Sequence, residues 1–126
     1  MDLRVNVGAL TLPNPVLVAS GTFGYGLEFR RAVRLDRLGG IVAKTITLQP
    51  RDGNPPPRLV ETPAGMLNAV GLQNVGLEAF LYDKLPGLRA LGVPVIVSVL
   101  GESAGDIRTL VQRLETADGI AALELN

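Results

Sequence analysis

Residues 41–45 read Ile41-Val42-Ala43-Lys44-Thr45, a short apolar run that ends in a charged residue and a polar one. Short runs of β-branched and small apolar residues are typical of strands covered on both faces, as in a parallel sheet. Lysine is a poor choice for the interior of such a sheet, because burial of an unpaired ammonium is costly. The run therefore predicts a buried strand with a functional group at its carboxyl end.

Three other runs repeat this pattern. Each is apolar and ends in a polar or small residue: Val16-Leu17-Val18-Ala19-Ser20-Gly21, Val93-Pro94-Val95-Ile96-Val97-Ser98 and Ala121-Ala122-Leu123-Glu124-Leu125-Asn126. The carboxyl ends of parallel strands meet at one edge, where ligands bind in α/β folds. We therefore expect a small-molecule site at one rim, formed by the polar residues of these ends: Ser20, Lys44, Ser98 and Asn126.

Three stretches between the runs predict crossover helices. Residues 28–35 and 77–88 have helical apolar spacing, and Pro86 is expected to kink or end the second helix. Ser103, followed three residues later by Asp106, is typical of the start of a third helix. Four strands joined by three helices make up half of a (β/α)8 barrel. We therefore predict an α/β fold, the N-terminal half of a TIM barrel; the alternative is a small open α/β sheet.

The remaining segments complete this partial barrel domain, which we assign to residues 1–126 and expect to stop at the end of the fourth strand. Residues 3–12 alternate around Gly8, which predicts an N-terminal β-hairpin. Residues 47–74 form a long excursion that contains three successive prolines, and we expect it to be an extended loop. Loops of this length in compact domains are usually functional.

Composition excludes several classes of function. Twelve Lys and Arg residues balance twelve Asp and Glu residues, so we expect no general attraction to nucleic acid or to an anionic membrane. The absence of Cys and His removes disulfides, thiol nucleophiles and His-based triads, and we expect no metal site. No apolar run approaches the ~20 residues of a membrane span, and Met1-Asp2-Leu3-Arg4 does not start a signal peptide. We expect a cytoplasmic protein.

Three features have more than one interpretation from the residues alone. Ser20-Gly21 and Ser98 suit the close approach of a flat ring, but each taken alone fits better with a strand that simply ends in a loop. Lys44 suits a Schiff-base amine, a cation beside an electron-rich cofactor, or a strand-end lysine whose charge reaches solvent. The apolar loop 65–74 carries three amides, which donate and accept hydrogen bonds and so suit a planar imide or amide ligand. Asn and Gly are also typical of turns. The loop can therefore be interpreted either as a ligand-binding segment or as a simple turn.

Several segments resemble dihydroorotate dehydrogenases of class 1. The similar segments are Asn14-Pro15-Val16-Leu17-Val18-Ala19-Ser20-Gly21-Thr22-Phe23-Gly24, Lys44-Thr45-Ile46-Thr47 and Arg51-Asp52-Gly53-Asn54-Pro55-Pro56-Pro57-Arg58. Residues 61–74 are similar to the class 1B subgroup, the NAD-linked form. Residues 124–126 resemble the start of the family motif Glu-Leu-Asn-x-Ser-Cys-Pro-Asn. The resemblance covers the whole chain in order.

This resemblance implies a flavin-dependent barrel that oxidises (S)-dihydroorotate to orotate in de novo pyrimidine biosynthesis. It implies contacts to FMN from Ser20, Gly21, Lys44, Thr45, Ser98 and Asn126. It implies contacts to the substrate from Lys44, Asn68, Ala69, Val70, Gly71, Leu72 and Asn126. No catalytic base is expected within the chain, since the cysteine of the family motif would follow Asn126.

The class 1B resemblance also implies partners. These are a subunit that carries FAD and an iron–sulfur cluster and passes electrons from FMN to NAD, and a second copy of the barrel subunit in a homodimer. Two alternatives from other classes stay open: an aldolase-type lyase that forms a Schiff base on Lys44, and a non-catalytic half barrel that works only as an assembly piece.

Overall fold

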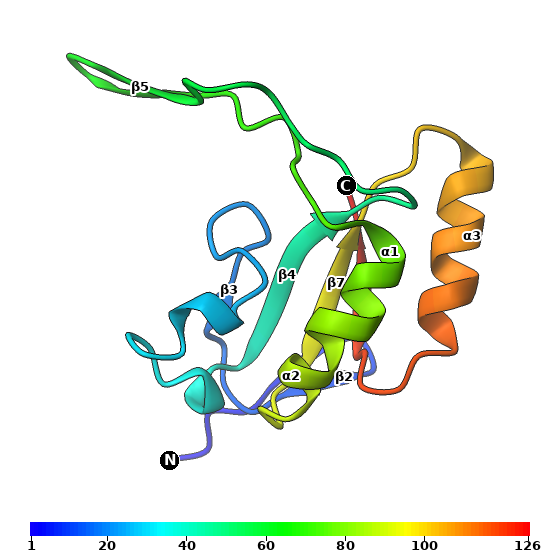
Figure 1. Cartoon of the computed structure of the whole chain (residues 1–126). Coiled ribbons are helices and arrows are strands. Elements are labelled where there is room, and N and C mark those ends of the chain that lie inside the picture. Colours follow the sequence, from blue (N-terminus) through cyan, green and yellow to red (C-terminus); the bar gives the residue numbers. More distant parts are fainter.

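The structure is a computed structural model that describes all of residues 1–126. Its centre is a parallel sheet of four strands in the order β3 (Leu17–Val18), β4 (Gly40–Ile46), β7 (Val95–Val99) and β8 (Ala122–Leu125) (Figure 1). The spatial order follows the chain, as in a barrel. The prediction of four adjacent parallel strands in an α/β fold is confirmed. No helix is both long enough and apolar enough to cross a lipid bilayer.

Two helical segments cover one face of this sheet (Figure 1). The first runs without a break through α1 (Gly76–Ala79), the π-helical turn η3 (Phe80–Lys84) and α2 (Leu85–Arg89), and the second is α3 (Ala104–Glu115). The core between helices and sheet consists of completely buried side chains, among them Ile41, Val97, Phe80, Leu88 and Leu110. Full burial of one such side chain contributes about 1.5–3 kcal/mol, so this interface holds the two layers together.

Both of these helical segments follow the predicted pattern. Pro86 is the second residue of α2, which begins directly after the wide turn η3, and proline cannot donate the regular helical hydrogen bond. Ser103 caps α3, and its hydroxyl accepts a hydrogen bond from the backbone N–H of Asp106 at 3.1 Å. The Asp106 carboxylate in turn accepts from the N–H of Glu102 at 3.0 Å, which pairs two backbone donors at this helix start.

The predicted helix over residues 28–35 is wrong. Only two 3₁₀ turns form in this region, η1 (Leu27–Phe29) and η2 (Leu35–Arg37). Four arginines, at positions 30, 31, 34 and 37, would stand three or four residues apart on a helix, and like charges at that spacing destabilise it. Gly26, which precedes η1, also has no side chain to cap a helix. The first crossover is therefore an irregular loop with short turns.

The amino-terminal hairpin is confirmed. Strands β1 (Val5–Val7) and β2 (Leu10–Leu12) pair in antiparallel fashion, with Gly8 at a φ of +59° in the turn between them. The hairpin lies at the end of the sheet where the parallel strands begin (Figure 1). It is therefore opposite the edge where the strands end and the predicted site residues lie.

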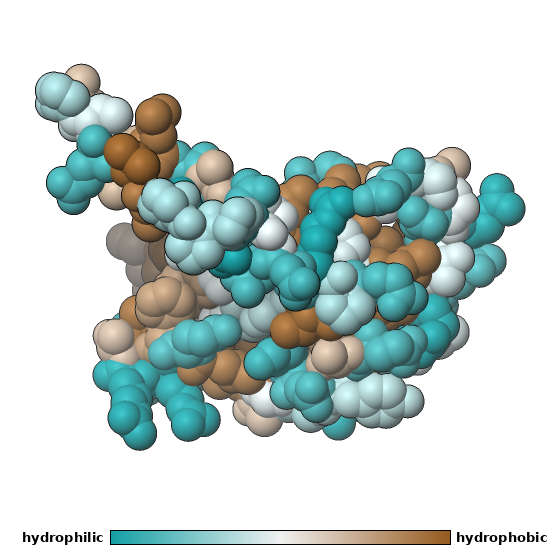
Figure 2. Space-filling model, turned by 45° about the horizontal axis from the view of Figure 1, so that its top comes forward, coloured by the Kyte–Doolittle hydropathy of each residue, from teal (hydrophilic) through white to brown (hydrophobic).

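The excursion over residues 47–74 differs from the expected loop. It contains a second hairpin, β5 (Leu59–Thr62) paired with β6 (Gly65–Asn68), which extends away from the body of the molecule (Figure 1). The β-branched residues of β5 and the Pro63-Ala64 turn favour this pairing. The three prolines that precede β5 had instead indicated an extended loop. Its exposed apolar side chains are visible at the upper left of Figure 2: Leu59, Val60, Met66 and Leu67.

The excursion leaves and rejoins the body at one point. Arg51 and Asn74 form an antiparallel bridge with two backbone hydrogen bonds of 2.9 Å. The buried Asn74 side chain accepts from the N–H groups of Thr47 (3.2 Å) and Gly76 (2.8 Å), and donates to the carbonyl of Leu72 (2.9 Å). These bonds attach the end of β4 to the start of α1, so the hairpin projects from a fixed base.

Candidate functional site at the carboxyl ends of the strands

A β-bulge at the end of β4 decides how the site is built. Ala43 lies opposite Val97 and Ile46 lies opposite Val99, so two residues of β4, Lys44 and Thr45, face a single position of β7. Ala43 and Ile46 are both 0% exposed and belong to the core beneath the helices. The extra residue therefore turns both Lys44 and Thr45 toward the opposite face of the sheet. Bulges commonly re-aim side chains in this way next to active sites.

Three strands contribute to a hydrogen-bonded group on that face. The Thr45 hydroxyl lies 2.9 Å from the hydroxyl of Ser98 on β7. The amide nitrogen of Asn126, directly after β8, donates to the Thr45 hydroxyl at 3.0 Å. Thr45 is 6% exposed and Ser98 is 0% exposed, so these groups satisfy each other away from water. The structure thus brings together three of the predicted site residues.

A second connection spans the whole sheet. The Ser20 hydroxyl, just beyond β3, donates to the Glu124 carboxylate on β8 at 2.9 Å. Strands β3 and β8 are the two outer strands, so this bond links residues from the two edge strands of the sheet. Glu124 pairs in register with Ser98 and therefore shares its face. Sequence reasoning missed Glu124 as a site residue, although its position two residues before Asn126 in a strand was a usable signal.

Lys44 is the one cation of this group. Its backbone N–H donates to the carbonyl of Gly24 at 2.8 Å, which ties the loop after β3 to the bulge. Its half-buried side chain forms none of the five ion pairs in the structure, and no hydrogen bond involves its ammonium. A partly buried ammonium without a protein partner favours an anion or an electron-rich group in front of it.

Gly21, next to Ser20, is exposed, and a Cβ at this position would meet nothing within 4 Å. The space beside its backbone is open to a ligand. In the same loop Tyr25 is buried, and its hydroxyl accepts from the N–H of Val75 at 3.0 Å, which links the loop to the start of α1. Burial raises the pKa of the Tyr25 hydroxyl above its ordinary value of 10.0, the Val75 hydrogen bond lowers it, and the nearby Glu28 charge raises it.

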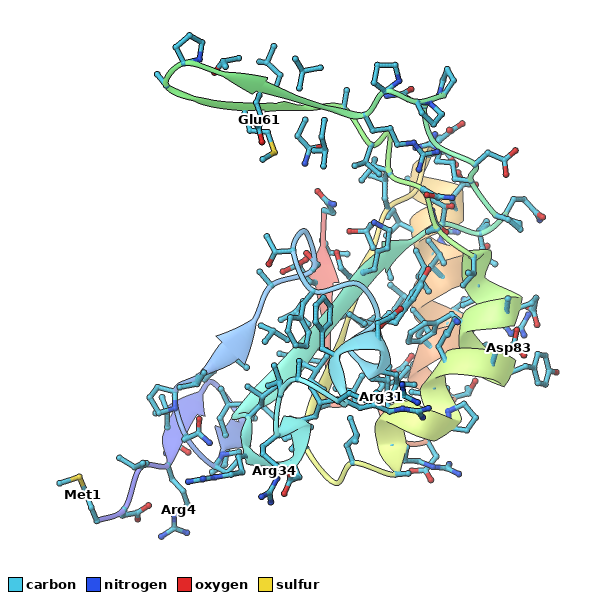
Figure 3. The ribbon with its side chains drawn as sticks, turned by 60° about the vertical axis from the view of Figure 1, so that its left-hand side comes forward. Met1, Arg4, Arg31, Arg34, Glu61 and Asp83 are labelled. Atoms are coloured by element: carbon cyan, nitrogen blue, oxygen red, sulfur yellow. The ribbon has the colours of Figure 1, made fainter.

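The predicted substrate loop, residues 68–72, is not hydrogen-bonded to this group. It follows the hairpin, which extends over the edge where β8 ends and is marked by Glu61 in Figure 3. No hydrogen bond joins the loop to Lys44 or Asn126; instead the Asn68 side chain accepts from the N–H of Val70 at 3.2 Å. Leu72 adopts a left-handed φ of +55°, which is uncommon for a residue other than glycine.

The anchoring of this loop is local. The N–H of Asn54 donates to the carbonyl of Val70 at 3.0 Å, and its side chain donates to the carbonyl of Ala69 at 2.9 Å. The Arg58 guanidinium bonds to the carbonyls of Asn54 and Asp52 and to the side chain of Gln73. Residues 51–58 therefore support residues 69–73 from one side. A surface hollow of about 540 Å³ lies elsewhere, between α1 and α3, and none of the predicted residues lines it.

Comparison with known proteins agrees with this architecture. Residues 2–126 match the family model described as dihydroorotate dehydrogenase. The catalytic subunit of dihydroorotate dehydrogenase B (NAD(+)) from Desulforudis audaxviator is 56% identical over 122 residues, which are 97% of this chain and 40% of that protein. The protein of the same name from Thermodesulfovibrio yellowstonii is 51% identical over 124 residues, 98% of this chain and 41% of that protein.

A solved structure shares the fold. The dihydroorotate dehydrogenase of Eimeria tenella, crystallised with ferulenol, superposes with a TM-score of 0.70 at 24% identity and covers 99% of this chain and 36% of that one. The chain spans about two fifths of the length of the curated relatives it matches. The likeness thus confirms that the fold is part of a TIM barrel. With the family model matching residues 2–126, the chain belongs to the dihydroorotate dehydrogenase family.

Proposed function

We propose that this chain is part of an FMN-dependent enzyme that oxidises (S)-dihydroorotate to orotate in pyrimidine biosynthesis. The observation that carries the proposal is the bulge of β4, which directs Lys44 and Thr45 together to the face where Ser98 and Asn126 lie. The relatives named for this activity are about half identical to the chain over nearly its whole length.

The donor set of this face fits a flavin. An ammonium, three hydroxyls and a carboxamide are neutral or cationic hydrogen-bonding groups, which suit the carbonyl and imide edges of an isoalloxazine ring. The backbone beside Gly21 is open, so a flat ring can approach it. We assign FMN contacts to the residues that carry these groups: Ser20, Gly21, Lys44, Thr45, Ser98 and Asn126. FMN supplies, when bound, the hydride acceptor for the oxidation.

Within this scheme, the site residues of this chain bind FMN or the substrate. Lys44 would hold FMN through its ammonium, a charge that would favour the reduced flavin, and no carboxylate forms an ion pair with it. Lys44 and Asn126 also bind the substrate, together with the loop from Asn68 through Ala69, Val70 and Gly71 to Leu72. The resemblance of residues 124–126 to the family motif implies that the general base would be a cysteine beyond Asn126 and not a residue of this chain.

We further propose that the enzyme is the NAD-linked form. Electrons then pass from FMN to NAD through a partner subunit that carries FAD and an iron–sulfur cluster, and the barrel subunit forms a homodimer in the cytoplasm. The names of the relatives, catalytic subunits of an NAD(+)-dependent enzyme, support a partner subunit. The chain contains no cysteine, so it offers no thiolate ligand for a cluster.

The test uses the full-length protein and the two lysines of this chain. Lys44→Gln should weaken FMN binding or slow flavin reduction by dihydroorotate by about 100-fold, because a charge aimed at developing charge is removed. Lys84→Gln is the matched control, since Lys84 lies in η3 on the helix side, 5.5 Å from the Tyr25 ring centre. If the Lys44 variant keeps its flavin and its reduction rate, the assignment is wrong.

The same samples separate the alternatives. A full-length protein without flavin absorbance, in which borohydride traps a carbonyl substrate on Lys44, would identify a Schiff-base lyase. A full-length protein that shows neither flavin absorbance nor trapping would favour a structural half barrel.

A further inference from the structure

The Ser20–Glu124 bond has a consequence for what Ser20 can offer to a ligand. A carboxylate only accepts hydrogen bonds, and a serine hydroxyl has one proton to donate. In this structure that proton points to Glu124, over a donor–acceptor distance of 2.9 Å. The remaining capacity of the Ser20 oxygen is its lone pairs. Toward a third group Ser20 is therefore an acceptor.

This polarity contrasts with that of Lys44 and of the Asn126 amide nitrogen. Lys44 presents an ammonium, which only donates, and the Asn126 nitrogen already donates to Thr45. FMN has donors of its own, the imide N–H of its ring and the hydroxyls of its ribityl chain, and these require acceptors. An acceptor at Ser20, beside the open backbone of Gly21, complements them.

We propose that Glu124 is a positioning residue of the flavin site: by taking the Ser20 hydroxyl proton, it makes Ser20 the acceptor for a hydrogen-bond donor of FMN. This inference rests on the proposed function, and it gives Glu124 a role that acts only through Ser20. Glu124 therefore need not contact the flavin, and its negative charge is not the essential property. An uncharged acceptor of the same length would serve equally well.

The test measures the dissociation constant of FMN from the full-length apoprotein, by flavin fluorescence quenching. Glu124→Met keeps the length of the side chain and removes the acceptor, and it should weaken FMN binding by about tenfold, the effect of one lost hydrogen bond. Glu124→Gln keeps a carbonyl acceptor and should bind FMN within about twofold of wild type. In a Ser20→Ala background, Glu124→Met should have no further effect.

Three outcomes would overturn the inference. Equal weakening by Glu124→Gln and Glu124→Met would show that the charge acts directly. An undiminished effect of Glu124→Met in the Ser20→Ala background would show that Glu124 acts independently of Ser20. If Glu124→Met does not fold, Glu124→Ala, which also lacks the acceptor, takes its place in the same comparison with Glu124→Gln and in the Ser20→Ala background. A wild-type apoprotein that does not bind FMN would refute the proposed function together with this inference.

Discussion

Thr45 and Ser98 place their hydroxyl oxygens 2.9 Å apart on neighbouring strands, because the bulge of β4 sets two residues opposite Ser98. In a regular strand one of Lys44 and Thr45 would face the helices. The bulge instead gives one face of the sheet both the ammonium of Lys44 and the hydroxyl that holds Asn126. A backbone irregularity of one residue thus assembles groups from three strands.

Thr45→Val tests the contribution of this hydroxyl to stability. Valine keeps the branched shape but leaves the completely buried Ser98 without its partner, which costs about 1–3 kcal/mol. We expect the free energy of unfolding of the full-length protein to fall by that amount, measured by urea denaturation. The double variant Thr45→Val/Ser98→Ala should recover part of the loss, because no buried hydroxyl is left unpaired. Thr62→Val, at an exposed position of β5 with no side-chain hydrogen bond, is the control and should change little.

Tyr25→Phe tests the anchoring of the loop after β3. The variant leaves the N–H of Val75 without its acceptor and should lower stability by about 1–2 kcal/mol at neutral pH. The folded-state pKa of Tyr25 is raised by burial, so its neutral form is favoured in the fold. The contribution of neutral Tyr25 to the free energy of unfolding is fully present below its unfolded-state pKa of 10.0. This contribution is lost as pH rises through the raised folded-state pKa.

The alkaline loss of stability should therefore be smaller in Tyr25→Phe than in wild type, when denaturation midpoints are compared from pH 8 to about pH 11. Tyr82→Phe is the control, since this tyrosine is 75% exposed. An identical alkaline loss in wild type and Tyr25→Phe would show that other groups cause it.

The parallel strands could be predicted because their signal is local. Runs such as Ile41 to Ala43 are apolar on both faces, and only a covered parallel strand needs that composition. The helix over residues 28–35 could not be judged from apolar spacing alone, because the repulsion among its arginines decides against it. The hairpin of β5 and β6 was hidden for another reason: its strands pair with each other and bury no side chain, so no face of either shows a core pattern.

For the site, the sequence indicated which residues lie at the carboxyl ends of the strands. It did not indicate toward which face of the sheet their side chains point. The bulge at Lys44 and Thr45 depends on register with β7, which is a property of two distant segments. The hydrogen bond between Ser20 and Glu124 joins residues 104 positions apart, so neither segment alone predicts it. Residue type could be predicted at the carboxyl ends, whereas the hydrogen-bond partners required the assembled sheet.

Asn68 decides whether the loop of residues 68–72 binds substrate or is only a turn. Asn68→Asp keeps the oxygen that accepts from the N–H of Val70 and replaces the amide donor with a carboxylate, whereas Asn68→Ala removes both. If the amide binds the anionic dihydroorotate, both variants should raise its KM by about tenfold or more at unchanged FMN content, with Asp at least as harmful as Ala.

Steady-state kinetics and flavin absorbance on the same full-length samples provide the measurement, with Thr62→Ala in the exposed hairpin as control. A normal KM in Asn68→Asp beside an impaired Asn68→Ala would mean that the side chain only holds the turn, and the substrate assignment of residues 68–72 would then be abandoned.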